Sequence, residues 1–185
     1  MKVEFRKTAE RRYAIKILCK DSIDLEMNPA PGFDDLMPHD LCHLIVEQVL
    51  HIENAIFGQI AKNGTAGSFR DPPLENLNSK NDSRQRRKIK QKGKNLVKQN
   101  LEDLAKSERA TYVCWQNWLS NSSDSELKRR ADEMKENAEN IFNQMSVAER
   151  AIYTKENLAK VRLRMRELSQ QWQNLKTGES MTVDW

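Results

Sequence analysis

Strand-like sequence lies at both ends of this chain of 185 residues, and this feature limits how the chain can fold. Apolar and polar residues alternate over residues 181–185, after a glycine that ends the preceding helical pattern. A strand at the C-terminus needs a sheet to join, and residues 2–28 are the candidate. We therefore expect residues 2–28 and 180–185 to form a small antiparallel sheet that closes residues 1–185 into a single domain. The β-forming segments near the N-terminus are residues 3–6, 12–19 and 23–27.

Helical sequence fills most of the chain between these strands. A helix is expected over about residues 36–62, where a broad apolar face leaves a narrow polar stripe flanked by Leu44 and Leu50. An apolar surface that nearly surrounds a helix is typical of a buried helix. Over residues 90–177 apolar residues recur at steps of three and four, with Glu108 in one place of the pattern, which predicts three or four packed helices. The expected fold class is α+β, with the sheet packed against a buried helix and a C-terminal helical bundle.

The composition is that of a polar protein with a modest core, because 38% of the residues are apolar and 31% are charged. No apolar run approaches the length of a membrane span, and residues 1–7 lack the apolar stretch of a secretory signal. Three cysteines without paired spacing favour reduced thiols, so we expect a cytoplasmic protein. The expected sub-regions are a β-meander with the histidine helix at 1–68, a loop and basic segment at 69–95, and a helical region ending in a strand at 96–185.

All three histidines of the chain fall on the helix expected over residues 36–62, at positions 39, 43 and 51. His39 and His43 are four residues apart, so their side chains would lie one turn apart on one face of the helix. Helical zinc sites use this spacing to bind the metal through two imidazoles. Near a helix N-terminus the charged form of His39 would be disfavoured, which suits a neutral imidazole ligand.

The stretch His39-Asp40-Leu41-Cys42-His43 resembles the HExxH helix of zincin-like zinc metallopeptidases, with aspartate in place of glutamate. A β-meander that leads into such a helix is also similar to the small core of those enzymes. The resemblance implies that His39 and His43 bind zinc and that Asp40 is the general base that activates a metal-bound water. Aspartate is one methylene shorter than glutamate, so this base would lie farther from that water.

A third metal ligand is not evident from the motif. Glu47 continues the polar stripe, but it lies about 12 Å of helix rise beyond His39. It would have to bend back to bind the metal, or it would support His43 from outside the ligand set. Glu53 and acids distant in the sequence are further candidates for the ligand. In the alternative interpretation there is no metal, and the stripe is the ordinary polar face of an amphipathic helix, formed by His39, Asp40, His43, Glu47 and His51.

The net charge of +4 is concentrated in one segment. Between residues 84 and 98 there are eight bases and no acid, and the remaining bases are outnumbered by the 27 acids. Clustered bases can follow a phosphate backbone, so nucleic acid is one candidate partner, although no aromatic residue lies in the segment to stack on a base. A solvated helix start or loop is the alternative. The expected contacts are Arg84, Arg86, Arg87, Lys88 and Lys90, followed by Lys92, Lys94 and Lys98.

Two functions from different classes are consistent with these patterns. The first is a cytosolic protein with a zinc site formed by His39, His43 and Glu47, acting as a metal-dependent hydrolase of zincin-like type with Asp40 as the catalytic base. The second is a non-catalytic module that binds nucleic acid or protein through residues 84–98 and its helical surface, which would also serve a homo-oligomer. Neither pattern predicts a membrane partner, and neither identifies a substrate.

Overall fold

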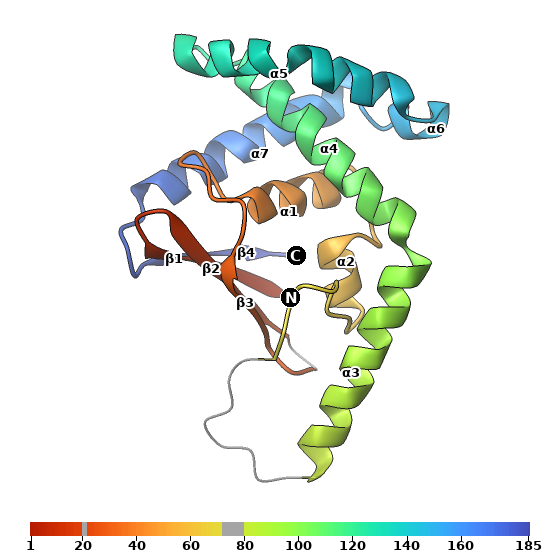
Figure 1. Ribbon diagram of the computed structural model, residues 1–185. Coiled ribbons are helices and arrows are strands. Elements are labelled where there is room, and N and C mark those ends of the chain that lie inside the picture. The colour runs from red at the N-terminus through yellow and green to blue at the C-terminus, as the bar shows by residue number, and fades with distance from the viewer. Residues whose placement is uncertain (20–21, 72–79) are drawn as a thin grey trace.

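The computed structural model describes residues 1–19, 22–71 and 80–185, apart from the side chains of residues 80–83 and 85. A four-stranded antiparallel sheet packs against a set of helices, which confirms the expected α+β fold class (Figure 1). The strands are β1 (Lys2–Ala9), β2 (Arg12–Leu18), β3 (Leu25–Ala30) and β4 (Ser180–Asp184). The helices are α1 (His39–Val49), α2 (Ile56–Ala61), α3 (Lys80–Gln99), α4 (Leu101–Ser120), α5 (Ser125–Gln144), α6 (Val147–Arg150) and α7 (Lys155–Asn174).

The sheet has the strand order β3-β2-β1-β4, so the last strand of the chain pairs with the first. Val3 lies opposite Val183, and Phe5 lies opposite Met181, in an antiparallel register. These four side chains are buried, because alternate residues of each strand point to the same face of the sheet. The predicted pairing of residues 180–185 with the N-terminal meander is therefore confirmed.

Helix α1 lies between the sheet and the helices α4 and α7 (Figure 1). Two polar contacts attach it to the sheet: Asp40 Oδ2 lies 2.5 Å from the Tyr13 hydroxyl on β2, and Gln48 Nε2 donates to the Asp184 carbonyl on β4 at 2.7 Å. The apolar residues of α1 from Leu41 to Val46 are buried, as its nearly continuous apolar surface predicted, and Val49 is half-buried. Helix α1 is thus a central element, and its polar side chains Asp40, His43 and Glu47 are buried, whereas His39 is exposed.

The prediction of one helix over residues 36–62 is wrong, because the chain forms two helices with a turn between them. The backbone of His51 has φ of 55°, a left-handed conformation that ends the α-helical path. The carboxylate of Glu47 accepts hydrogen bonds from the amides of Ile56, at 3.1 Å, and Phe57, at 2.9 Å. It satisfies free N–H groups at the start of α2, where the preceding residue Ala55 offers no capping side chain.

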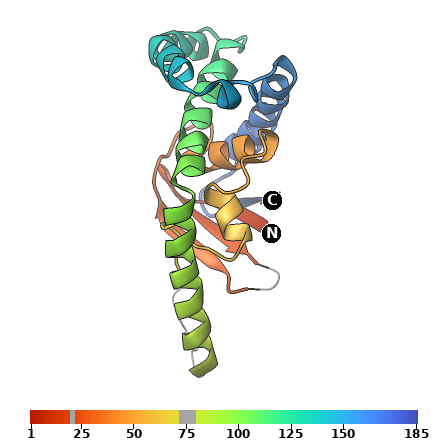
Figure 2. The same ribbon diagram turned by 90° about the vertical axis from the view of Figure 1, so that its right-hand side faces the viewer.

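Helix α4 follows α3 directly in the chain but at an angle to it (Figure 1), and α3 extends away from the rest of the fold (Figure 2). Helix α4 packs against α1, α5 and α7, so it connects the buried helix to the C-terminal helices. The basic segment belongs to α3, so the loop expected from residue 69 is helical from Lys80 onward, and residues 72–79 of it lie outside the described residues. Within the described parts of the chain, every helix is too short or too polar to cross a membrane.

The pairing of β4 makes a testable prediction about stability. Val183 is buried between the sheet and the core, whereas its neighbour Thr182 points to solvent. Val183→Asp would bury an unpaired carboxylate, so we expect it to lower the free energy of unfolding by about 3 kcal/mol or more. Thr182→Asp in the same strand should cost less than about 1 kcal/mol. Urea denaturation of both variants would measure the difference, and equal effects would contradict the burial of β4.

Candidate metal centre

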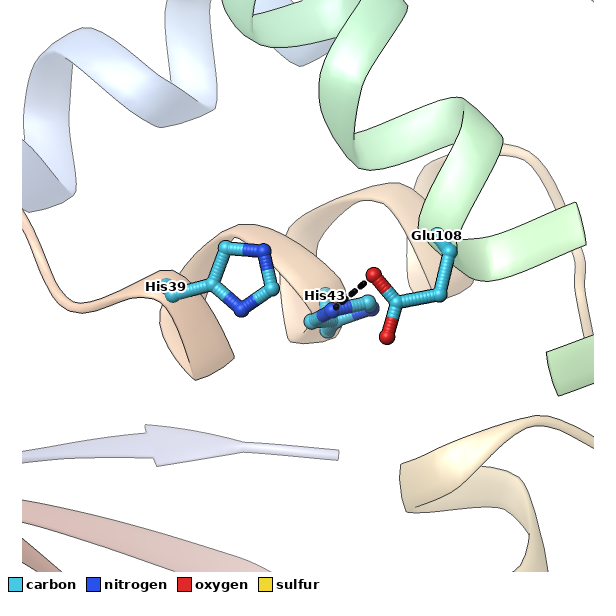
Figure 3. Close-up of side chains that lie close together, drawn as sticks. All are labelled: His39, His43 and Glu108. Carbon is cyan, nitrogen blue, oxygen red and sulfur yellow. Dashed lines mark ion pairs between the residues drawn. The ribbon is translucent and has the colours of Figure 1, made fainter. Parts of the chain in front are cut away.

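His39, His43 and Glu108 come together although they belong to two different helices (Figure 3). His39 and His43 lie on the first two turns of α1, and Glu108 lies on α4, which crosses above them. One potential ligand atom from each side chain lies within 4.8 Å of the other two. The two imidazole rings are nearly perpendicular, with centroids 4.6 Å apart. Among the described residues, this is the group of His, Cys, Asp and Glu side chains close enough to hold a metal ion.

His43 and Glu108 already have a spacing suited to a metal. His43 Nε2 lies 3.5 Å from Glu108 Oε2, which is long for a hydrogen bond. Tetrahedral zinc with bonds of about 2.0–2.1 Å holds its ligand atoms about 3.3–3.4 Å apart. The atoms of the wider group, up to 4.8 Å apart, would have to approach by on the order of 1 Å. His39 and Glu108 are exposed and can make this adjustment, whereas His43 is 1% exposed and fixed.

His43 is held in place by a buried hydrogen-bond network on its other ring nitrogen. Its Nδ1 lies 2.7 Å from Ser107 Oγ, and Ser107 in turn donates to Glu47 Oε1 at 2.8 Å. Because the Ser107 proton is directed to Glu47, the serine oxygen accepts the Nδ1 proton of His43. A second hydroxyl, that of Thr111, lies 3.3 Å from the same nitrogen. The neutral ring therefore presents the lone pair of Nε2 toward Glu108.

A lone pair that faces a carboxylate is unfavourable unless a cation lies between them. The cation is either a proton on His43, which makes an ion pair with Glu108, or a metal ion. The surroundings favour the forms that bind metals: burial lowers the pKa of His39 and so favours its neutral imidazole, and the contact with His43 holds the pKa of Glu108 below its usual range. The geometry is suited to a metal because a second imidazole, His39, completes the group.

Glu47 does not join His39, His43 and Glu108 in the metal-ligand group. Of the two positions considered from the sequence, the structure places it outside the ligand set, where it supports His43 through Ser107. Burial raises the pKa of the Glu47 carboxyl to about 7, while the hydrogen bonds from Ser107 and from two backbone amides act in the opposite direction. Outer partners of this kind fix the tautomer and orientation of a metal-binding histidine.

Asp40, predicted to be the catalytic base, lies outside the group as well. Its carboxyl group is buried and contacts the Tyr13 hydroxyl, which also lies within hydrogen-bond distance of the Pro31 carbonyl. Burial raises the pKa of Asp40, and the hydrogen bond with Tyr13 lowers it. This position links α1 to the sheet and does not place the carboxylate beside His43 and Glu108. The third histidine, His51, is exposed in the turn after α1.

Ser107, His43 and Glu108 also have the order of a serine–histidine–acid triad. Ser107 is 0% exposed, however, and its hydroxyl donates to Glu47, so no substrate carbonyl can reach its oxygen. The serine acts on the orientation of His43 and is not available as a nucleophile.

Glu108 is the residue of this site that the sequence analysis did not identify as a ligand. It occupies a place in the apolar pattern of α4, between Leu104 and Tyr112, where a charged residue is unexpected. This charged residue within an apolar pattern is the sequence feature that could have indicated a functional role for Glu108. The sequence alone did not pair it with the histidines, because the contact joins residues 65 positions apart in the chain.

A cavity of about 310 Å³ opens beside the group, with His39 and Glu108 in its wall. Apolar and aromatic side chains form most of the remaining lining, and they are Phe33, Met37, Tyr112, Trp115 and Met134. Small-molecule sites commonly combine an apolar lining with a few polar groups in this way. The cavity therefore gives a small ligand access to the exposed side of the group.

Comparisons with protein families, with curated proteins and with solved structures find no match for this chain.

The buried hydrogen bonds among His43, Ser107 and Glu47 lead to a prediction that can be tested without a metal. Ser107→Ala leaves Nδ1 of His43 and one acceptor position of Glu47 without their partner, so we expect a loss of about 1–3 kcal/mol in the free energy of unfolding. Ser120→Ala on the same helix removes an exposed hydrogen bond to Asn117 and should change stability by less than about 0.5 kcal/mol. Denaturant titration compares the two, and a neutral Ser107→Ala would show that the network contributes nothing.

Proposed function

We propose that this protein is a zinc-dependent hydrolase of a small substrate, with His39, His43 and Glu108 as the metal ligands. The observation that carries the proposal is the approach of these three ligand atoms to within 4.8 Å, with the buried His43 oriented by Ser107 and Glu47. Two histidines and one carboxylate are a ligand set of catalytic zinc sites, which keep a further position open. The open side here faces the 310 Å³ cavity.

The ligand set suits more than one metal, and one of its distances is closer to the spacing expected for zinc. Two histidines and a carboxylate also hold iron(II) in oxygenases, where the ligands occupy one face of an octahedron about 3.0 Å apart. The 3.5 Å between His43 Nε2 and Glu108 Oε2 is closer to the tetrahedral value of about 3.3–3.4 Å. Zinc bound here would supply a water whose pKa is lowered toward neutrality.

The protein's own residues have three roles in this proposal. His43 is the fixed ligand, and His39 and Glu108 close on the metal from the exposed side. The apolar side chains of the cavity, including Trp115 and Met134, bind the apolar part of the substrate and exclude water from it. From the zincin resemblance the proposal keeps the two histidines and the zinc. It does not use Asp40 as the base, since the carboxylate of Asp40 contacts Tyr13.

Metal binding is tested by titrating chelator-treated protein, purified without an affinity tag, with zinc and separately with iron(II). We expect one zinc per chain with a dissociation constant in the micromolar range or tighter. His39→Ala, His43→Ala and Glu108→Gln should each weaken zinc binding by about 100-fold or more, since removing only an outer partner of a ligand already costs about 10–100-fold. Preference for iron(II) over zinc would favour the oxygenase-type site.

Matched control variants show whether weaker zinc binding results from the loss of a ligand or only from the loss of a charge or an imidazole elsewhere. His51→Ala removes the exposed third histidine, and Glu102→Gln removes a carboxylate from α4 that pairs with Arg109. Both should bind zinc like the unaltered protein. Asp40→Asn should also retain zinc and lose stability instead, because it changes the contact with Tyr13. Equal zinc affinity for His43→Ala and His51→Ala would contradict the proposed centre.

Hydrolysis is tested with a panel of small nitrophenyl esters and anilides of increasing acyl length. We expect turnover that requires zinc and disappears in His43→Ala. Met134→Trp fills the cavity with a larger side chain, so it should reduce turnover of the longer acyl groups while zinc binding is retained. Zinc binding without turnover of any member would leave a metal site and contradict the hydrolase.

A further inference from the structure

The eight bases of residues 84–98 on α3 do not form a uniform charged surface, because four of them line a cleft. The cleft has a volume of about 790 Å³ and lies between α3 and residues 65–71. Arg86, Arg87, Lys90 and Lys94 contribute from the helix, and Arg70 contributes from the opposite wall. Asp71 is the one carboxylate in the described lining, and it pairs with Arg86 at 2.9 Å. The cleft therefore has a strongly positive interior.

Both walls of this cleft are fixed by the fold. The helix wall packs closely on the segment beneath it at Gly93, where an added Cβ would lie 2.4 Å from Thr65 Oγ1. The opposite wall is tied to the sheet, because Arg70 and Glu26 exchange two backbone hydrogen bonds of 2.7 and 2.9 Å. The glycine that interrupts the basic sequence thus allows the contact that forms the cleft.

The other bases of the segment point elsewhere. Arg86, Lys90 and Lys94 recur at steps of four and share one face of α3, whereas the series that begins at Arg84 is offset by two residues, about 200° around the helix. Arg84, Lys88 and Lys92 belong to this offset series, and Lys98 lies one step of four beyond Lys94; all four are exposed and do not line the cleft. The chain therefore contains two sets of four bases that differ in position and match in charge.

One side chain in the cleft retains an unused donor. Arg86 pairs with Asp71 through Nη1, but its Nε is buried and has no hydrogen-bond partner among the described residues. A buried guanidinium donor without a partner is costly, and an anion in the cleft would satisfy it. The positive cleft and the free donor both indicate an anionic ligand.

We propose that this cleft binds the phosphate backbone of nucleic acid, as a second site that shares no residue with the candidate metal centre. The four helix bases of the cleft extend over about 12 Å, which spans three to four phosphates of one strand at about 3.4 Å each along a duplex. Phe69 is the aromatic residue of the described lining and is 3% exposed, so the cleft has no surface for base stacking. Binding therefore reads phosphates and not sequence.

An anionic membrane is a less suitable partner for this surface. A helix that lies on a membrane presents exposed apolar residues beside its bases. On the described part of α3, Ile89 is 7% exposed, and no large apolar side chain is among the exposed ones. The bases of α3 and Arg70 face one another across a cleft with two walls, and this shape fits a strand of phosphates better than a flat bilayer.

The test compares the two matched sets of bases in binding to a fluorescein-labelled 20-base-pair DNA duplex and to RNA of the same sequence. One variant carries glutamine at Arg86, Arg87, Lys90 and Lys94, and the other carries glutamine at Arg84, Lys88, Lys92 and Lys98. At about 0.15 M salt, where screening acts beyond about 8 Å, we expect the cleft variant to lose affinity at least about tenfold and the outer variant less than about threefold. A scrambled sequence should bind equally well.

The salt dependence gives a second readout from the same experiment. For the unaltered protein on duplex DNA, the plot of log affinity against log salt should have a slope of about −4, and neutralising the cleft bases should remove most of it. Equal losses in both variants, or no binding by the unaltered protein at about 50 mM salt, would overturn the proposal. Cleft-dependent binding to phosphatidylserine vesicles that exceeds binding to the duplex would overturn it in favour of a membrane.

Variants with four substitutions can fail to fold, so a matched pair of single substitutions completes the design. Lys90 lies in the cleft and Lys88 outside it, and both are exposed. Lys90→Glu should weaken duplex binding several-fold more than Lys88→Glu, while thermal unfolding midpoints stay equal. His43→Ala should leave duplex binding unchanged, so a failure of the metal centre and a failure of this cleft are distinguishable.

Discussion

The buried carboxylate of Glu47 is the interaction on which the arrangement of this protein depends. It accepts hydrogen bonds from the first amides of α2 and from the Ser107 hydroxyl on α4, while its own backbone belongs to α1. Burying a carboxylate is costly, and three hydrogen bonds offset that cost only if the three helices keep these positions. The same arrangement directs Ser107 to His43 and places Glu108, the next residue of α4, opposite the imidazole. The turn after α1 and the candidate metal centre therefore have a common origin.

The elements that could be predicted from the sequence are those set by local periodicity. Alternation over residues 181–185 identifies β4 because side chains of a strand alternate between two faces, and a terminal strand has few sheets to join. The nearly continuous apolar surface of α1 likewise predicts its burial, which the exposure of 1% for both His43 and Glu47 confirms. The end of α1 could not be predicted in this way, since the cap of α2 is a side chain nine residues upstream. Residues 50–55 also continue an apolar pattern that favours helix.

Only the two histidines of the site could be predicted from the sequence, for a related reason. His39 and His43 are brought together by a single helix turn, so their spacing alone predicts their proximity. Glu108 is brought to them by the packing of α4 on α1, which no local pattern encodes. Asp40 shows the converse: the motif gives it a catalytic role, yet the sheet beneath α1 supplies Tyr13 as its partner. In α3 the same limit applies, because the sequence shows eight clustered bases, whereas the close packing of Gly93 on Thr65 places four of them along a cleft.

The central claim is that His39, His43 and Glu108 bind one metal ion together, and X-ray absorption at the zinc edge tests it most directly. Protein loaded with one equivalent of zinc should show two imidazole ligands and otherwise oxygen, at about 2.0–2.1 Å, with no sulfur. Glu108→Gln should change the oxygen shell and leave both imidazoles. A spectrum without the two imidazoles, or with sulfur at about 2.3 Å, would contradict the account, because the metal would then be bound elsewhere in the chain.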